Sequence, residues 1–181
     1  CDARMIILAV LLIFIHSFAI EPLRENARLM GEPLNLFEPF IAVANSGAIL
    51  LIIPLVFMTL ISDFPKIDTN TVFYISRTGR SSWLLGQILK LVFMAASFLA
   101  VIFLGAVLPM LGSGFVSENW SKVATDFVLE FPERAQNFGV RLLPVNLYNQ
   151  MSVAEAAVQS YLLVFVYLLT IGLLMLAFSL A

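Results

Sequence analysis

Three polar residues inside the hydrophobic stretches of this chain stand out by type and position. His16 lies in an apolar run, where a titratable side chain is costly and usually faces the protein interior. Asn45 and Ser46 lie together in a second apolar run, followed by Gly47. Their amide and hydroxyl groups can hydrogen-bond between packed helices or line a polar path. Asn45 and Ser46 are therefore either helix-packing residues or part of a polar path. His16 is either a hydrogen-bonded neutral side chain or part of such a path.

Other chemistry is poorly supported. His16 is the only histidine and Cys1 the only cysteine, so neither a histidine cluster nor an internal disulfide can form. We expect no metal site and no cofactor. The chain contains no Gly-x-x-x-x-Gly-Lys-Ser/Thr loop, so we do not expect it to bind ATP through a Walker motif.

An enzyme embedded in a membrane would need carboxylates, histidines or a nucleophile clustered at one depth. The apolar stretches hold one histidine and one lysine, Lys90, with Glu38 and Asp63 at their edges. We therefore predict that the chain carries out no bond chemistry. We expect Lys90 either to extend toward the lipid headgroups or to pair with Asp63.

Composition indicates the fold class. Hydrophobic residues make up 61% of the chain and charged residues 12%, and the mean hydropathy is +0.98. A soluble domain has roughly 45–50% apolar and about 25% charged residues. So much apolar surface must face lipid, which predicts an all-α polytopic transmembrane helical bundle. The formal charge of −2 gives no indication of nucleic-acid binding.

The apolar runs predict the number of spans. A bilayer core about 30 Å thick needs roughly 20 apolar residues per helix. We predict four membrane spans, at residues 5–20, 40–61, 83–110 and 158–181. Pro22 is expected to end the first span and Pro54 to kink the second. We expect residues 1–181 to be a single transmembrane domain truncated at both ends.

Basic residues predict the orientation. Lys66, Arg77 and Arg80 lie in the short 62–82 loop, whereas the basic residues of the 112–157 loop are diluted over a greater length. Cytoplasmic loops are enriched in lysine and arginine. We therefore expect the N-terminus and loop 62–82 to be cytoplasmic and loop 112–157 to lie outside a cell membrane. Within the outer loop, Ser121 is expected to cap a short helix at about 121–129.

The 62–82 loop has the pattern of a short amphipathic helix. Pro65 stops the preceding helix, and Asp68 or Thr69 can cap a new one that carries apolar side chains. Arg77 and Arg80 follow it. Such a helix between two spans either lies in the lipid headgroups or binds a soluble partner.

These segments resemble a known family. The Ser-Asp-Phe-Pro run from Ser62, the Tyr-Ile-Ser-Arg-Thr-Gly-Arg run from Tyr74 and the Trp-Leu-Leu-Gly-Gln run from Trp83 are similar to the permease of bacterial ATP-binding-cassette (ABC) exporters. Glu38-Pro39-Phe40-Ile41-Ala42 fits the same resemblance, which covers residues 36–104 in useful detail. This class has six spans per subunit, so four predicted spans suit a fragment that lacks two C-terminal spans.

The resemblance implies a function, partners and site residues. In such permeases the loop between the second and third spans carries a coupling helix that sits in a groove of a separate cytoplasmic ATPase subunit. Two permeases, as a homodimer or a heterodimer, form the translocation path. The residues expected to contact the ATPase are Phe73, Tyr74, Arg77 and Arg80, and those expected along the path are Asn45, Ser46 and His16. The alternatives are a membrane-embedded enzyme and a non-transporting accessory or immunity protein.

Overall fold

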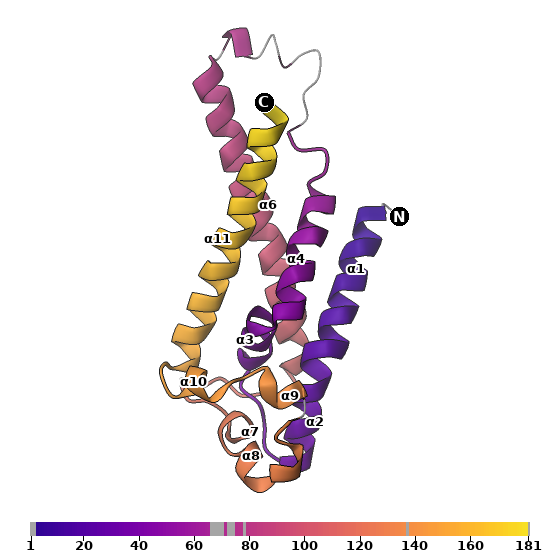
Figure 1. Cartoon of the computed structure of the whole chain (residues 1–181), viewed down its shortest axis with the longest axis vertical. Coiled ribbons are helices and arrows are strands. Elements are labelled where there is room, and N and C mark those ends of the chain that lie inside the picture. The colour runs from indigo at the N-terminus through magenta and orange to yellow at the C-terminus, as the bar shows by residue number, and fades with distance from the viewer. Residues whose placement is uncertain (1–2, 66–70, 72–74, 78, 137, 181) are drawn as a thin grey trace.

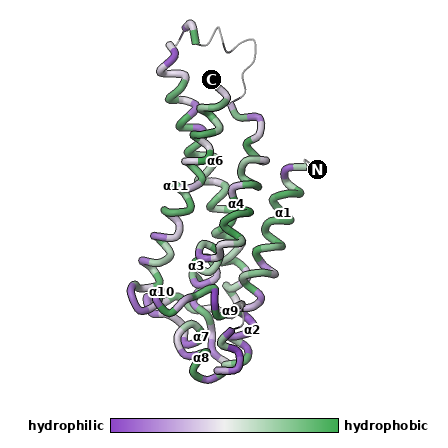
Figure 2. Tube along the Cα trace, viewed as in Figure 1, coloured by the Kyte–Doolittle hydropathy of each residue, from purple (hydrophilic) through white to green (hydrophobic). Residues whose placement is uncertain are grey.

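The computed structural model describes residues 3–65, 71, 75–77, 79–136 and 138–180. This part of the chain is helical and contains no strand, which confirms the predicted all-α bundle. Three helices are long and apolar enough to cross a membrane, and a sharply bent pair gives a fourth candidate span (Figure 1). Hydrophobic residues run along these helices, whereas polar residues concentrate at one end of the bundle (Figure 2). The prediction of about four spans is therefore confirmed.

The first span is longer than expected. Pro22 was predicted to end it, but the helix continues to Met30. Pro22 lies in the first turn after a π-helical turn, where a missing N–H costs little, and the Glu21 N–H donates to the His16 carbonyl. The helix ends at Gly31, whose φ of 67° favours glycine. Three consecutive segments form it: α1 (Ala3–Ile15), η1 (His16–Ile20) and α2 (Glu21–Met30).

The second predicted span is two helices. They are α3 (Glu38–Asn45) and α4 (Gly47–Leu60), which meet at Ser46 with a bend of 84°. The expected kink at Pro54 is not where the direction changes, since α4 continues through that residue. The prediction of one helix over 40–61 is therefore wrong, because the chain becomes extended at Ser46.

The remaining spans lie side by side. They are α6 (Arg80–Val107), extended by η2 (Leu108–Met110), and α11 (Val153–Leu180). A Cβ on Gly172 would lie 2.4 Å from the Leu91 side chain, so glycine permits the close approach of α11 to α6. α11 begins at Val153 rather than at 158.

A capping box explains this earlier start of α11. The N–H and hydroxyl of Ser152 donate to a Glu155 carboxylate oxygen over 2.9 and 3.0 Å, and the Glu155 N–H donates to the Ser152 hydroxyl over 3.3 Å. These reciprocal bonds satisfy donors that the first turn of a helix would leave free.

The connection from α6 to α11 forms a cap at one end of the bundle, opposite the N-terminus (Figure 1). The predicted cap by Ser121 is confirmed, because its hydroxyl accepts the Ala124 N–H over 3.2 Å. Phe127 is only 1% exposed and packs inside the protein. The short helices of this connection are α7 (Lys122–Thr125), α8 (Phe127–Glu130), η3 (Pro132–Arg134), α9 (Phe138–Arg141) and α10 (Val145–Tyr148).

Candidate functional site

The break between α3 and α4 is the most unusual feature within the spans. Ser46 has φ −77° and ψ 109°, an extended conformation between two helical residues. Its N–H donates to the carbonyls of Ala42 and Val43 over 3.0 and 3.3 Å, which closes the last turn of α3. The Asn45 amide donates to the Ile41 carbonyl over 2.8 Å. Asn45 and Ser46 therefore end α3 and turn the chain.

The break leaves backbone groups free at the start of α4. The first bond of that helix is from the Leu50 N–H to the Ser46 carbonyl, at 2.9 Å. The N–H groups of Gly47, Ala48 and Ile49 have no hydrogen-bond partner within the part of the chain that the structure describes. The start of α4 carries a partial positive charge and the end of α3, on the other side of Ser46, a partial negative charge, so the break presents both donors and acceptors.

A cavity of about 380 Å³ lies against the break, between α4 and α11. Its wall is mostly apolar, with a few polar groups, which is the usual make-up of a small-molecule site. The residues that line it are Ala44, Asn45, Gly47, Leu50, Leu51, Ser160, Leu163, Val164 and Tyr167.

The structure separates the three residues predicted for a polar path. Asn45 lines the cavity, while Ser46 is 6% exposed and forms the bend behind it. His16 starts the π-helical turn of the first span and is not among the residues that line this cavity.

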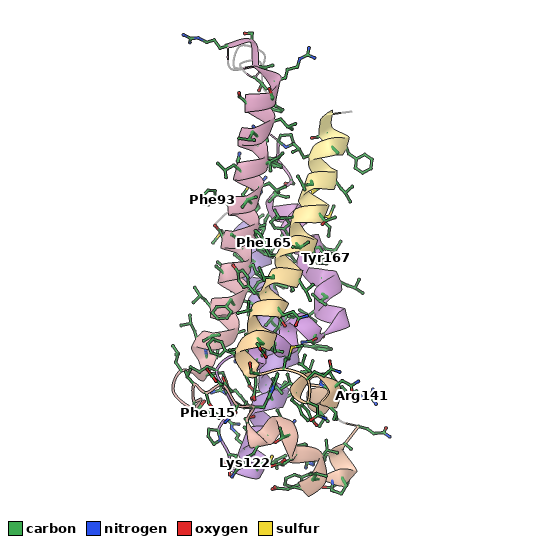
Figure 3. The ribbon with its side chains drawn as sticks, turned by 90° about the vertical axis from the view of Figure 1, so that its left-hand side faces the viewer. Phe93, Phe115, Lys122, Arg141, Phe165 and Tyr167 are labelled. Carbon is green, nitrogen blue, oxygen red and sulfur yellow. The ribbon has the colours of Figure 1, made fainter. Side chains whose placement is uncertain are left out.

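Ser160 and Tyr167 were not predicted as site residues. They lie seven positions apart on α11, on the same face, and both line the cavity. Figure 3 shows Tyr167 on α11, with Phe165 on the other side of the helix toward α6. The spacing of two hydroxyl side chains on one helical face was the available signal, but α11 also contains other polar residues, and nothing in the sequence pairs these two with the break near Ser46.

The predicted coupling segment is only partly described. Phe73 and Tyr74 lie outside the described residues. Arg77 and Arg80 are both exposed, and Arg80 begins α6 after Gly79, whose φ is 85°. Both arginines therefore lie on the surface at the end of the bundle that also carries the N-terminus (Figure 1).

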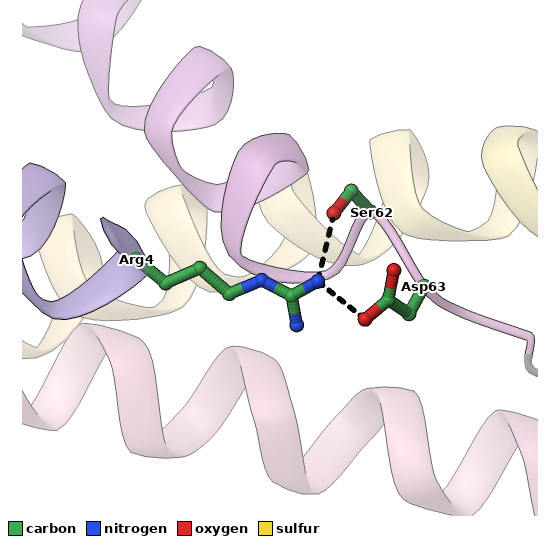
Figure 4. Close-up of polar contacts among 3 residues, drawn as sticks. All are labelled: Arg4, Ser62 and Asp63. Atoms are coloured by element: carbon green, nitrogen blue, oxygen red, sulfur yellow. Dashed lines mark hydrogen bonds and ion pairs between the residues drawn. The ribbon is translucent and has the colours of Figure 1, made fainter. Parts of the chain in front are cut away.

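Two basic residues contact the start of this loop. The Arg4 guanidinium forms an ion pair with Asp63 and donates to the Ser62 hydroxyl over 3.3 Å (Figure 4). The alternative pairing of Asp63 with Lys90 is not seen. Instead, the Lys90 ammonium lies 5.7 Å from the centroid of the Phe64 ring, a cation–π contact. Asp63 therefore ties the end of α4 to the start of α1.

Glu38 is a fully buried carboxylate with a structural role. It accepts the Ser121 N–H over 2.7 Å, the Ser121 hydroxyl over 2.8 Å and the Asn35 N–H over 3.1 Å. The Asn35 amide in turn donates to the Ser117 and Asn119 carbonyls over 2.7 and 3.1 Å. Because these donors occupy both oxygens, Glu38 joins the start of α3 to the α6–α11 connection rather than offering a free acid or base.

Among the residues that the structure describes, no group of three or more His, Cys, Asp or Glu side chains could hold a metal ion.

Comparison with known proteins gives no relative. No family model, no curated protein and no solved structure matches the chain.

Proposed function

We propose that the chain is the permease subunit of an ABC exporter, coupled through loop 62–82 to a separate cytoplasmic ATPase. The observation that carries the proposal is the position of the loop whose sequence resembles such permeases. The end of α4 and the start of α6, which this loop connects, lie at the N-terminal end of the bundle, away from the α6–α11 connection (Figure 1). Exposed Arg77 and Arg80 lie at this end, where a soluble partner has access to them.

The contacts of Asp63 support a route for coupling. Closure of an ATPase pair would pull on loop 62–82. Because Asp63 at the start of this loop pairs with Arg4, that movement would reach the first span as well as α4 and α6. A loop tied to three helices at one end is suited to change the packing of a bundle, as alternating access requires.

The broken span supports transport as well. Interrupted helices expose backbone donors and acceptors inside the membrane, and transporters use them to bind cargo near the bilayer midplane. The break at Ser46 and the cavity beside it provide such groups.

Co-purification tests the proposal directly. The full-length protein is extracted from its native membrane in a mild detergent, and the soluble chain that accompanies it is identified. We expect an ATP-binding-cassette ATPase, bound less well when Arg77 and Arg80 are both replaced by alanine. Arg141→Ala, an exposed arginine in the opposite connection, is the matched control. If no ATPase accompanies the protein, or if the ATPase binds the double variant normally, the proposal is wrong.

A further inference from the structure

A groove of about 400 Å³ is lined by α1, α4 and α6, and α11 contributes no residue to its wall. The wall is apolar apart from Lys90 and Ser97, both of which are exposed on α6. Phe93, also in the wall, is 66% exposed. The groove therefore opens onto the surface of the bundle that faces lipid.

Lys90 lies at one boundary of the hydrocarbon core. From Lys90 to Met110, where the helix formed by α6 and η2 ends, the rise is about 30 Å, which is the thickness of that core. The Lys90 ammonium lies against the Phe64 ring. The residue before Phe64 is Asp63, which pairs with Arg4 at the start of the first span. The Lys90 end of the groove is therefore at the level of the lipid headgroups, at the N-terminal end of the bundle.

The groove below Lys90 has the depth of one leaflet. From Lys90 to Val101 the rise along α6 is about 16 Å, and half of the hydrocarbon core is about 15 Å. Ser97 is a small side chain between the larger Phe93 and Val101, so it leaves room in the middle of the groove. A lysine that only extends to the headgroups needs no such groove. A charge above an apolar groove of this length fits a lipid with an anionic head and an acyl chain.

Lys90 supplies an uncompensated charge at this end of the groove. Among the described residues its ammonium forms no ion pair, and its contact with the Phe64 ring leaves its three N–H groups without an acceptor. The other local charges cancel. Arg4 is paired with Asp63, and the partial positive charge at the start of α1 offsets the partial negative charge at the end of α4. The wall contains no acidic residue, so one positive charge remains for an anion.

A phospholipid suits this charge better than a second copy of the chain. Among the described residues of α1, α4, α6 and α11, the one acidic residue is Glu155, in the first turn of α11 at the opposite end of the bundle (Figure 1). A neighbouring copy in the same orientation would therefore bring no carboxylate from these helices to Lys90. A phospholipid brings a phosphate at the level of the headgroups, with an acyl chain directly below it.

We propose that this groove binds an anionic phospholipid, whose phosphate accepts from the Lys90 ammonium and whose acyl chain lies along Phe93, Ser97 and Val101. The cation–π contact with Phe64 holds the ammonium at its end of the groove. With the N-terminus in the cytoplasm, as the basic residues predict, the lipid belongs to the cytoplasmic leaflet, whose anionic lipids attract basic residues. The binding requires no ATPase, so it is separate from the exporter proposal.

Photo-labelling of the purified full-length protein in a neutral maltoside detergent tests the groove. The probes are phosphatidylglycerol and phosphatidylcholine with the same photoactivatable group at the end of an acyl chain. At low salt we expect phosphatidylglycerol to label peptides that contain residues 93–101 about fivefold more than phosphatidylcholine does, which is the effect of one lysine near a membrane surface. Added salt should reduce this preference.

Matched variants separate the head from the chain. Lys90→Gln should lower labelling by phosphatidylglycerol to the level of phosphatidylcholine, and Lys90→Arg should retain the preference because it keeps the charge. Lys122→Gln removes an exposed lysine from the α6–α11 connection and should leave the preference unchanged. Ser97→Phe should remove most labelling by both lipids, because the ring fills the groove from an exposed position. Val158→Phe adds a ring to the exposed face of α11, outside the groove, and should have no effect.

Three results would overturn the proposal. Equal labelling by the two lipids, or an unchanged preference in Lys90→Gln, would exclude an anionic head at Lys90. Normal labelling of Ser97→Phe would show that the acyl chain lies elsewhere. Absence of labelling at residues 93–101 in the wild type would show that no phospholipid occupies the groove. Each of these results leaves the exporter proposal untouched, because ATPase binding is measured separately.

Discussion

Arg4 and Asp63 are 59 residues apart in the sequence and form an ion pair at one end of the bundle. The side chains are 36% and 71% exposed, so solvent screens the attraction. A double-mutant cycle with Arg4→Ala and Asp63→Ala should give a coupling free energy of about 0.2–1 kcal/mol in thermal unfolding at low salt. The coupling should shrink at high ionic strength. Strictly additive effects at low salt would show that the pair does not stabilise the bundle.

The predicted orientation can be tested by thiol labelling. Single cysteines replace Ser81, beside exposed Arg80, and Ser117, in the α6–α11 connection, in a background without Cys1. An impermeant thiol reagent applied to intact cells should label position 117 and spare position 81 until the membrane is opened, because basic loops remain in the cytoplasm. The reverse pattern would invert the orientation.

The ATPase contact is expected to depend on an aromatic anchor. Aromatic and arginine side chains commonly dominate protein interfaces, so Phe73→Ala should weaken ATPase binding by about 2 kcal/mol and lower transport-coupled ATP hydrolysis. Insertion and span packing should be unchanged. Identical affinity of purified ATPase for wild type, Phe73→Ala and Arg77→Ala would rule out this loop as the coupling site.

The two readings of Asn45 and Ser46 predict different defects. If they serve a path, replacing both with leucine abolishes transport while yield and assembly remain normal. The structure gives Asn45 a further task, because its amide satisfies the Ile41 carbonyl at the end of α3. Loss of that bond should cost about 1 kcal/mol in thermal unfolding. Normal transport by a well-folded double variant would exclude the path.

The buried Glu38 should be intolerant of a neutral amide. Glu38→Gln would turn an NH₂ group toward donors on Ser121 and Asn35, leaving at least one buried donor without an acceptor. We expect a loss of about 1–3 kcal/mol in thermal unfolding. Glu32→Gln, which breaks only the exposed pair with Lys122, should cost less than about 1 kcal/mol. Equal effects of the two variants would contradict a structural role for the Glu38 network.

Hydropathy predicted the spans because lipid imposes a strong compositional constraint on any helix that crosses it. It did not predict the break at Ser46, since residues 40–61 are apolar on both sides of the bend. Pro22 was predicted to end the first helix because proline usually does so. The π-helical turn that lets the helix continue past it has no signal in the composition. The early start of α11 was predictable, because Ser152 and Glu155 have the spacing of a capping box.

Only part of the wall of the candidate cavity could be predicted from the sequence. Asn45 was identified by its type, as an amide in an apolar run, and the structure places it in the cavity wall. Ser160 and Tyr167 lie more than 100 residues further along the chain, and only tertiary packing brings α11 to the break. Loop residues Arg77 and Arg80 were predicted from charge and resemblance, which need no tertiary information.

The π-helical turn at His16–Ile20 is equivalent to one residue inserted into an otherwise regular helix. One residue corresponds to about 100° of rotation about a helix axis. The wide turn absorbs that residue without the rotation, so α1, which packs on α4, and α2, which packs on α9, keep the angular phase of one regular helix. Deleting one residue from this turn would return it to an α-helical turn, and Leu23 and Asn26, now 2% and 7% exposed, would stay on the interface that they fill.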